Sequence, residues 1–71
     1  MNIQESYEKK KTEYFILITN PEILKSQKIT AYMKFREMLV ALLSAHLINK
    51  IEYENERLYV YNLLMIFIER P

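Results

Sequence analysis

Apolar residues recur at helical spacing over residues 31–48, which makes this stretch the strongest predicted element. Phe35, Leu39 and Leu42 fall at i, i+4 and i+7, and His46 extends the same face. The stretch contains no Gly or Pro and is rich in Ala, Leu and Met, which favour helix. Its polar strip is narrow, so we expect this helix to be buried on more than one side, at the centre of the fold.

The segment before it, residues 3–18, changes from polar to apolar along its length. The apolar run at residues 14–18 fits either a helix or a buried strand, because short apolar runs do not separate the two, and we favour a helix. The first twelve residues, 1–12, are polar enough to form a partly ordered arm.

A second, short helix is predicted over Pro21–Ser26. Thr19 or Asn20 is a suitable N-cap, and proline is favoured at the first helical position. Residues 27–30 then form a turn that leads into the long helix, which Thr30 caps.

The period changes after the long helix, over residues 49–61. Ile51 and Tyr53 alternate with Glu52 and Glu54. Leu58 and Val60 alternate with Arg57, Tyr59 and Tyr61, and such alternation is typical of half-buried strands. Asn55 lies between the two runs and tolerates a left-handed turn conformation. We therefore predict a β-hairpin here.

The continuous apolar run at residues 63–68 either prolongs the second strand or forms a short helix capped by Asn62. It is shorter than the ~17 residues that a membrane-spanning helix needs, so we expect no membrane association. The predicted fold class is a small α+β domain, with two or three helices followed by a β-hairpin and an apolar C-terminal segment. Residues 1–71 form a single domain at this length.

The composition excludes most self-contained enzymes. The chain has no Gly, Cys or Asp and a single histidine, His46. These absences exclude a phosphate-binding loop, an ordinary zinc site, an EF-hand and a Ser-His-Asp triad. We predict a non-enzymatic protein with no catalytic residues, metal ligands, cofactor or small-molecule substrate. His46 is either a pH-sensitive group or, more in keeping with its place near a helix end, a histidine that caps terminal carbonyls.

Charge and hydropathy point towards a macromolecular partner. The net charge is +1, but residues 9–36 hold seven basic residues against two acidic ones. This balance fits a polyanion footprint or an ordinary solvated surface. The hydrophobic fraction of 51% is high for so small a chain, which favours a homodimer or a bound protein partner. Without a recognisable signal peptide, a cytoplasmic location is expected.

The predicted order of elements resembles the winged helix-turn-helix DNA-binding family over about residues 14–61. The resemblance rests on the spaced leucines Leu39 and Leu42, the His46–Leu47–Ile48 step and the two predicted wing strands. His46 stands where that family usually has Gly. The resemblance implies a small regulator that binds double-stranded DNA.

In that interpretation the long helix enters the major groove. Thr30, Lys34 and Arg36 would reach the base edges, and Lys25 and Lys28 would contact phosphates. The wing tip at residues 54–56 is acidic, so phosphates would repel it.

The competing hypothesis is a protein-binding or inhibitory module that acts through an apolar, tyrosine-rich surface near the C-terminus. Tyrosine suits such an interface because it combines an apolar ring with a polar hydroxyl. The candidate interface residues are Tyr59, Tyr61, Leu63, Leu64, Met65 and Phe67.

Overall fold

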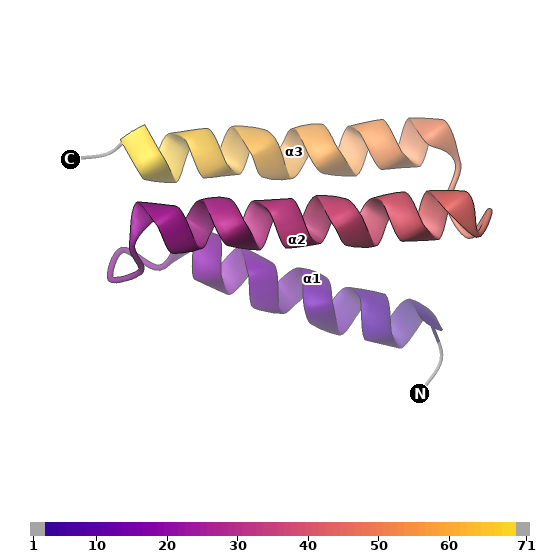
Figure 1. The fold of residues 1–71 in the computed structure, drawn as a ribbon, viewed down its shortest axis with the longest axis horizontal. Coiled ribbons are helices and arrows are strands. Elements are labelled where there is room, and N and C mark those ends of the chain that lie inside the picture. Colours follow the sequence, from indigo (N-terminus) through magenta and orange to yellow (C-terminus); the bar gives the residue numbers. More distant parts are fainter. Residues whose placement is uncertain (1–2, 70–71) are drawn as a thin grey trace.

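The computed structural model describes residues 3–69, which form three α-helices. Helix α1 spans Ile3–Thr19, α2 spans Lys25–Ser44 and α3 spans Lys50–Glu69. Figure 1 shows α2 between α1 and α3, with each helix running opposite to the one before it. The two ends of the chain therefore lie at opposite ends of the long axis.

The central position predicted for the long helix is confirmed, because α2 supplies most of the buried core. Phe35 and Leu39 are completely buried, and Ala31 and Tyr32 lie beside them on the same face of α2. Residues at this spacing lie on one side of a helix and can face two neighbours at once. The buried apolar residues are Ile18, Ala31, Tyr32, Phe35, Leu39, Val60 and Leu64.

Aromatic side chains tie the three helices together around Phe35. The rings of Tyr14 and Phe15 in α1 lie 6.3 and 6.2 Å from the Phe35 ring, centroid to centroid. Phe15 also lies 5.8 Å from Tyr59 of α3. Such tilted and edge-on pairs add to the stabilisation from burial alone.

The predicted helix over Pro21–Ser26 is wrong, because these residues form the turn and the start of α2. The Glu22 N–H donates to Asn20 Oδ1 at 2.9 Å, and the Ile23 N–H donates to the Asn20 carbonyl at 3.2 Å. Asn20 thus closes a turn around Pro21 instead of capping a helix. Helix α2 begins at Lys25 and runs unbroken through the predicted turn at 27–30.

The second turn reverses the chain with a left-handed residue. His46 has a φ of 60°, the position at which a helix commonly ends in glycine. The His46 N–H donates to the Leu43 carbonyl at 3.0 Å, and the Leu47 N–H donates to the Leu42 carbonyl at 2.9 Å. This is the hydrogen-bond pattern of a Schellman motif. His46 therefore ends α2 through its backbone conformation.

The predicted β-hairpin is wrong, since residues 50–69 form one helix and the described residues contain no strand. Asn49 begins α3 with a reciprocal capping box. Its Oδ1 accepts from the Glu52 N–H at 2.7 Å, and Glu52 Oε1 accepts from the Asn49 N–H at 3.1 Å. Asn55, the expected turn residue, lies within this helix.

The α3 sequence also satisfies a helical period that overrides the alternation. Val60 and Leu64 are buried four residues apart, and Tyr53 is half-buried on the same face. Ile51 and Leu58, which a strand would place inward beside Tyr53 and Val60, are 73% and 51% exposed. Packing against α2 thus selects the helical register.

The α+β fold class and its winged architecture are overturned by this arrangement, which is a three-helix bundle. Residues 63–68, left open between strand and helix, are the last turns of α3. Residues 3–12 of the predicted polar arm are helical, and residues 1–2 of that arm lie outside the described residues. None of the three described helices combines the length and the apolar character needed to cross a membrane.

Candidate functional site

Helix α1 diverges from α2 towards its N-terminal end, which leaves one end of the bundle open (Figure 1). A groove of about 890 Å³ lies there between α1, the turn after α2 and the first half of α3. We call it the open-end groove. It is lined by Ile3, Gln4, Tyr7, Glu8, Leu42, Leu47, Ile48, Glu52, Asn55 and Glu56.

The apolar part of the open-end groove is accessible to solvent. Ile3 is 59% exposed and Leu47 is 51% exposed, whereas Leu42 and Ile48 are half-buried at its base. The Schellman motif positions Leu47, because its hydrogen bond brings this residue back over Leu42. A partner laid in the groove would remove this apolar surface from water.

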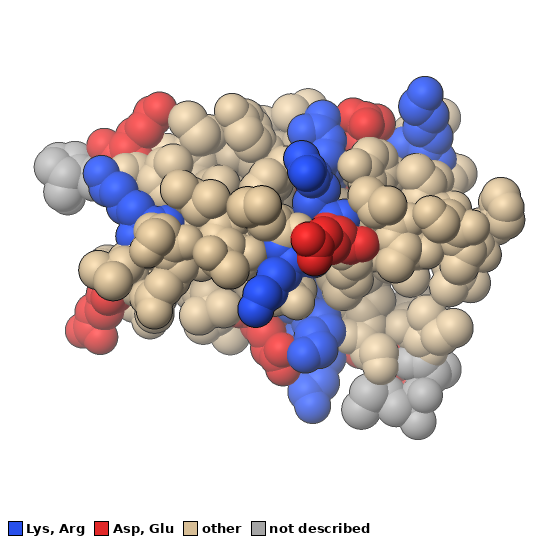
Figure 2. Space-filling view, viewed as in Figure 1, with Lys and Arg blue, Asp and Glu red and all other residues tan. Residues whose placement is uncertain are grey.

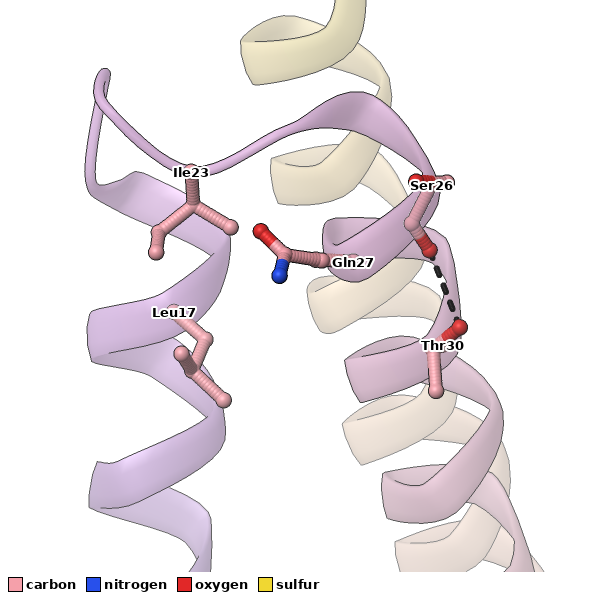
Figure 3. A pocket seen from close by; sticks show the side chains of 5 residues that line it. All are labelled: Leu17, Ile23, Ser26, Gln27 and Thr30. Carbon is pink, nitrogen blue, oxygen red and sulfur yellow. Dashed lines mark hydrogen bonds between the residues drawn. The ribbon is translucent and has the colours of Figure 1, made fainter.

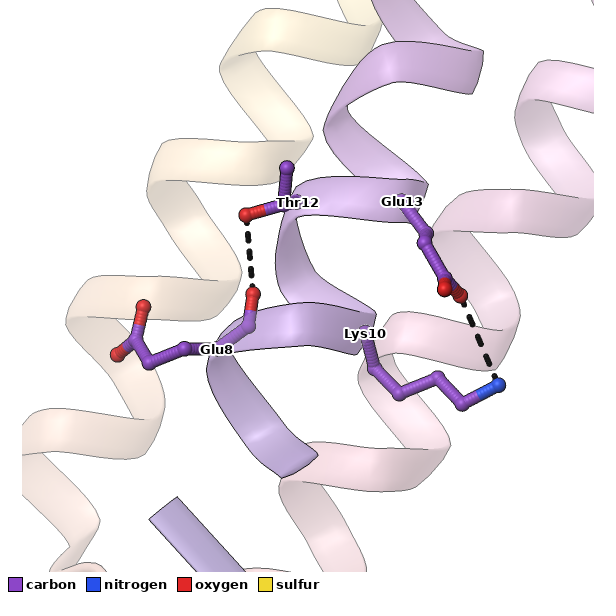
Figure 4. A network of polar contacts seen from close by, with 4 residues as sticks. All are labelled: Glu8, Lys10, Thr12 and Glu13. Carbon is purple, nitrogen blue, oxygen red and sulfur yellow. Dashed lines mark hydrogen bonds and ion pairs between the residues drawn. The ribbon is translucent and has the colours of Figure 1, made fainter. Parts of the chain in front are cut away.

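Three carboxylates border the same groove. In Figure 4 the Glu8 side chain extends away from Lys10 and Glu13, which form their own ion pair at 3.6 Å elsewhere on α1. The Glu8 carbonyl accepts a hydrogen bond from the Thr12 hydroxyl at 2.9 Å, and its carboxylate is left to the groove. Glu52 and Glu56 border the groove from α3.

The other two carboxylates are held by contacts within the protein. Glu52 Oε1 accepts from the Asn49 N–H in the capping box. Glu56 Oε2 lies 2.9 Å from Lys11 Nζ, and the Lys11 ammonium also lies 5.8 Å from the Tyr7 ring centroid. A carboxylate has room for about four hydrogen bonds, so both groups can still accept donors from a partner.

The pKa of the Tyr7 hydroxyl reflects burial and the negative charges around the groove. Burial and, to a smaller extent, the negative charges of Glu56, Glu8 and Glu52 together raise the pKa of this hydroxyl to about 12. Both causes disfavour a tyrosinate anion. The groove therefore favours cations, and Lys11 is the cation that the chain itself places there.

Metal binding receives no support from the described part of the chain. Within residues 3–69, no group of three or more His, Asp or Glu side chains is arranged to hold a metal ion. The three groove carboxylates are thus spread along two helices and suit an extended cationic partner better than a point charge.

A second, smaller hollow of about 310 Å³ lies at the other end of the bundle (Figure 3). Figure 3 shows Leu17 and Ile23 on the α1 side and Gln27 between them and α2. Gln27 Oε1 accepts from the Leu24 N–H at 3.2 Å, and the Thr30 hydroxyl donates to the Ser26 carbonyl at 2.9 Å. This hollow is shallow, and its polar groups serve the start of α2.

The residues predicted to contact nucleic acid do not form one surface. Lys28 is only 4% exposed, with its ammonium 5.5 Å from the centroid of the Phe67 ring. Thr30, Lys34 and Arg36 are exposed on α2. Lys34 and Arg36 are two residues apart, which at about 100° per residue places them on nearly opposite sides of the helix. Lys25 is exposed in the first turn.

The predicted interface residues surround α3 instead of sharing a face. Tyr59 is 59% exposed beside Phe15 of α1, whereas Tyr61 is 40% exposed, with its ring 5.8 Å from that of Tyr32 in α2. Leu64 belongs to the core. The remaining predicted interface residues are half-buried: Leu63, Met65 and Phe67.

The sequence prediction missed the open-end groove. The capping box over Asn49 and Glu52 was visible as an Asn-x-x-Glu motif and would have predicted the start of α3. The splay of α1, which opens the groove, has no local sequence motif. No family model, curated protein or solved structure matches this chain.

Proposed function

We propose that this chain is a protein-interaction module whose open-end groove binds an amphipathic, positively charged helix of a partner protein. The observation that carries the proposal is one groove that combines an apolar base with three carboxylates. A helix with apolar residues on one face and Lys or Arg at its edges matches both parts. The prediction of a protein-binding module is kept, and its surface moves from the α3 tyrosines to the groove.

A helix is the partner that fits the shape of the site. The residues that line the groove come from the first halves of α1 and α3, from Leu42 near the end of α2 and from the turn that follows it. A fourth helix laid there would contact all three and complete a four-helix arrangement. Enclosed small-molecule pockets bury most of their ligand, whereas Ile3 and Leu47 at this site are more than half exposed.

The two parts of the groove serve different purposes. Burial of the side chains beside Ile3 and Leu47 supplies most of the affinity, because it removes apolar area from water on both partners. Glu8, Glu52 and Glu56 select positively charged partners and speed their association, since charge complementarity affects specificity and on-rate more than affinity.

Fluorescence anisotropy with three labelled probes tests the proposal. The first is a synthetic amphipathic helix of Leu and Lys, the second has Glu in place of every Lys, and the third is a DNA duplex. We expect micromolar binding of the Lys peptide and at least about tenfold weaker binding of the Glu peptide. Failure of the Lys peptide to bind would contradict the proposal. Preferential, salt-dependent binding of the duplex would favour the DNA-binding prediction instead.

Matched variants locate the site. Ile3→Ser should weaken peptide binding, while Ile16→Ser should not, because both residues lie on α1 at 59% and 58% exposure and only Ile3 lines the groove. Glu8→Gln/Glu56→Gln should weaken binding about fivefold, which corresponds to roughly 1 kcal/mol for the loss of one exposed and one half-buried charge. Glu13→Gln/Glu22→Gln changes the net charge equally outside the groove and should leave binding unchanged.

We also propose that the module acts in the cytoplasm. A chain without cysteine folds without disulfides and is compatible with a reducing compartment. Fractionation of cells that express a tagged chain tests this, and recovery of the chain outside the cytoplasmic fraction would contradict it.

A further inference from the structure

Helix α2 carries two adjacent stripes with the 4-3-4-3 spacing of helix–helix contacts. The first stripe faces the bundle and consists of Lys28, Tyr32, Phe35, Leu39 and Leu42. The second stripe follows one residue later at every position and consists of Ile29, Met33, Arg36, Val40 and Leu43. The three-helix bundle covers the first stripe, whereas in the second stripe only Leu43 is half-buried.

The second stripe presents apolar side chains to solvent. Ile29, Met33 and Val40 are 41%, 50% and 44% exposed. Arg36 lies between Met33 and Val40, and Glu37 lies next to it on the outward side. We call Ile29, Met33, Arg36, Glu37 and Val40 the α2 ridge. Single exposed apolar residues are ordinary, but a stripe with this spacing marks a helix contact surface.

The α2 ridge is symmetric about the point between Arg36 and Glu37. Met33 precedes Arg36 by three residues, and Val40 follows Glu37 by three. Two such helices crossing antiparallel about this point place Met33 opposite Val40 and Arg36 opposite Glu37, twice each. An isologous dimer requires a surface that is complementary to itself in this way.

We propose that a second copy of this chain docks on the α2 ridge, and that the two α2 helices pack antiparallel across a twofold axis between Arg36 and Glu37. This surface is distinct from the open-end groove, because none of the ridge residues lines the groove. The dimer therefore leaves both grooves accessible for partner helices.

The accessible surface area of the protein is large enough for a second copy of the chain to dock. The chain exposes 5226 Å², whereas a compact protein of 8.7 kDa exposes about 4,700 Å². The molecule measures 39 × 25 × 14 Å, so its broad faces are large relative to its thickness. A standard dimer interface covers about 800 Å² on each copy, which is about 15% of this surface.

The distribution of charge supports a second copy over an unrelated partner. Figure 2 shows a band of charged side chains of both signs across the middle of the molecule, with uncharged side chains over most of the surface on either side and further charged groups at the left end and the upper right. The α2 ridge has the same order along one helix, apolar at both ends and charged at the centre. A twofold axis through such a band pairs opposite charges and places the apolar parts together.

Sedimentation equilibrium of the full chain tests the proposal. We expect a mass of twice 8.7 kDa at high micromolar concentration and dissociation on dilution. Met33→Glu should raise the dimer dissociation constant at least about tenfold, because two carboxylates would be buried at the contact. Ile66→Glu is the matched control, since Ile66 is also 50% exposed but lies on α3. It should leave the dimer intact.

Charge reversal tests the antiparallel register separately. Arg36→Glu alone and Glu37→Arg alone should each weaken self-association, because each places like charges opposite each other twice. An equimolar mixture of R36E and E37R chains should form a heterodimer, since one copy then supplies two carboxylates and the other two guanidinium groups. Circular dichroism should show unchanged helix content in every variant.

Three outcomes would overturn the proposal. The first is a monomer at the highest concentration reached. The second is a dimer that Met33→Glu and Ile66→Glu weaken equally, which would place the contact elsewhere. The third is failure of the mixed R36E and E37R chains to associate while each single variant remains helical, which would exclude the antiparallel register.

Discussion

The two halves of the bundle use the same three helices for different purposes. In the closed part, which runs from the first turn past the middle of α2, the side chains of Ile18, Phe35, Leu39 and Val60 are completely buried. In the open half, beside the second turn, Leu42 is half-buried and Leu47 is 51% exposed. The difference arises because α1 diverges from α2 towards its N-terminal end (Figure 1). The comparison shows that the closed half supplies the stability that allows the open half to keep an apolar groove.

The largest expected effect on stability comes from truncating one core residue in each half of the bundle. Phe35→Ala should lower the free energy of unfolding by about 3–5 kcal/mol, because it removes a fully buried ring that contacts the rings of Tyr14 and Phe15. Leu42→Ala in the open half should cost about 1 kcal/mol, since much of its surface already faces the groove. Urea unfolding followed by circular dichroism measures both. Equal losses would show that the two halves are packed alike.

The next largest loss of stability is expected at the start of α3, at the open end of the bundle. Asn49→Ala should cost about 1 kcal/mol, because it leaves the first α3 N–H groups without the Asn49 Oδ1 acceptor. Asn62→Ala, within the same helix, should be neutral or stabilising by a few tenths of a kcal/mol, since alanine has the higher helix propensity. Thermal unfolding of the two variants compares them directly. A loss at Asn62 as large as that at Asn49 would argue against the capping role.

A stabilising change is expected at the second turn. His46→Gly should raise the free energy of unfolding by about 0.5–1 kcal/mol, because glycine adopts a φ of 60° without the steric cost that a side chain adds. His46→Val should have the opposite effect, since a β-branched residue is poorly tolerated there. If His46→Gly proved destabilising in urea, the histidine side chain would have a stabilising role that outweighs its backbone strain.

The smallest effect is confined to alkaline pH. An unfolded tyrosine ionises near its ordinary pKa of 10, while Tyr7 in the groove has a pKa of about 12. The folded state thus binds a proton more tightly, so this contribution to stability is complete below pH 10 and is lost as the pH rises through 12. Tyr7→Phe should remove that part of the pH dependence, and Glu56→Gln should lower the Tyr7 pKa. Tyrosinate absorbance and thermal unfolding between these pH values measure both effects.

Much of the helical structure could be predicted from local sequence. The spacing of Phe35 and Leu39 placed a buried helix at the centre, whereas the region after Pro21 was predicted as a short helix and forms a turn. The boundaries were less certain, because Asn20 satisfies turn hydrogen bonds and helix caps with the same side chain. Local capping preferences alone do not decide between the two.

The prediction of a β-hairpin was wrong because the pattern of a single sequence does not distinguish a strand from a helix in this segment. Residues 51–60 satisfy both a period of two and a helical period, and the choice depends on which residues α2 can cover. Tyr53 and Val60 fit either period, whereas Ile51 and Leu58 fit only the strand. The Asn49 and Glu52 capping box was the local evidence for a helix.

The open-end groove could not be derived from the sequence because it depends on an angle between helices. Glu8 and Glu56 are 48 positions apart in the printed chain, and the parallel direction of α1 and α3 brings the first halves of both helices to one site. The exposed stripe on α2 was closer to being predictable. The face predicted from the spacing of Phe35, Leu39 and Leu42 is the stripe that the bundle covers, and the adjacent stripe was not predicted.

The odd number of helices has a mechanical consequence. Since α1 begins at one end of the bundle and α3 finishes at the other, a pulling force applied at Ile3 and Glu69 acts along the 39 Å axis (Figure 1). Such a force slides the helices past one another in shear, so that the aromatic contacts around Phe35 resist together instead of separating one at a time. An even number of helices would place both attachment points at one end, where the same force would peel the outer helices apart.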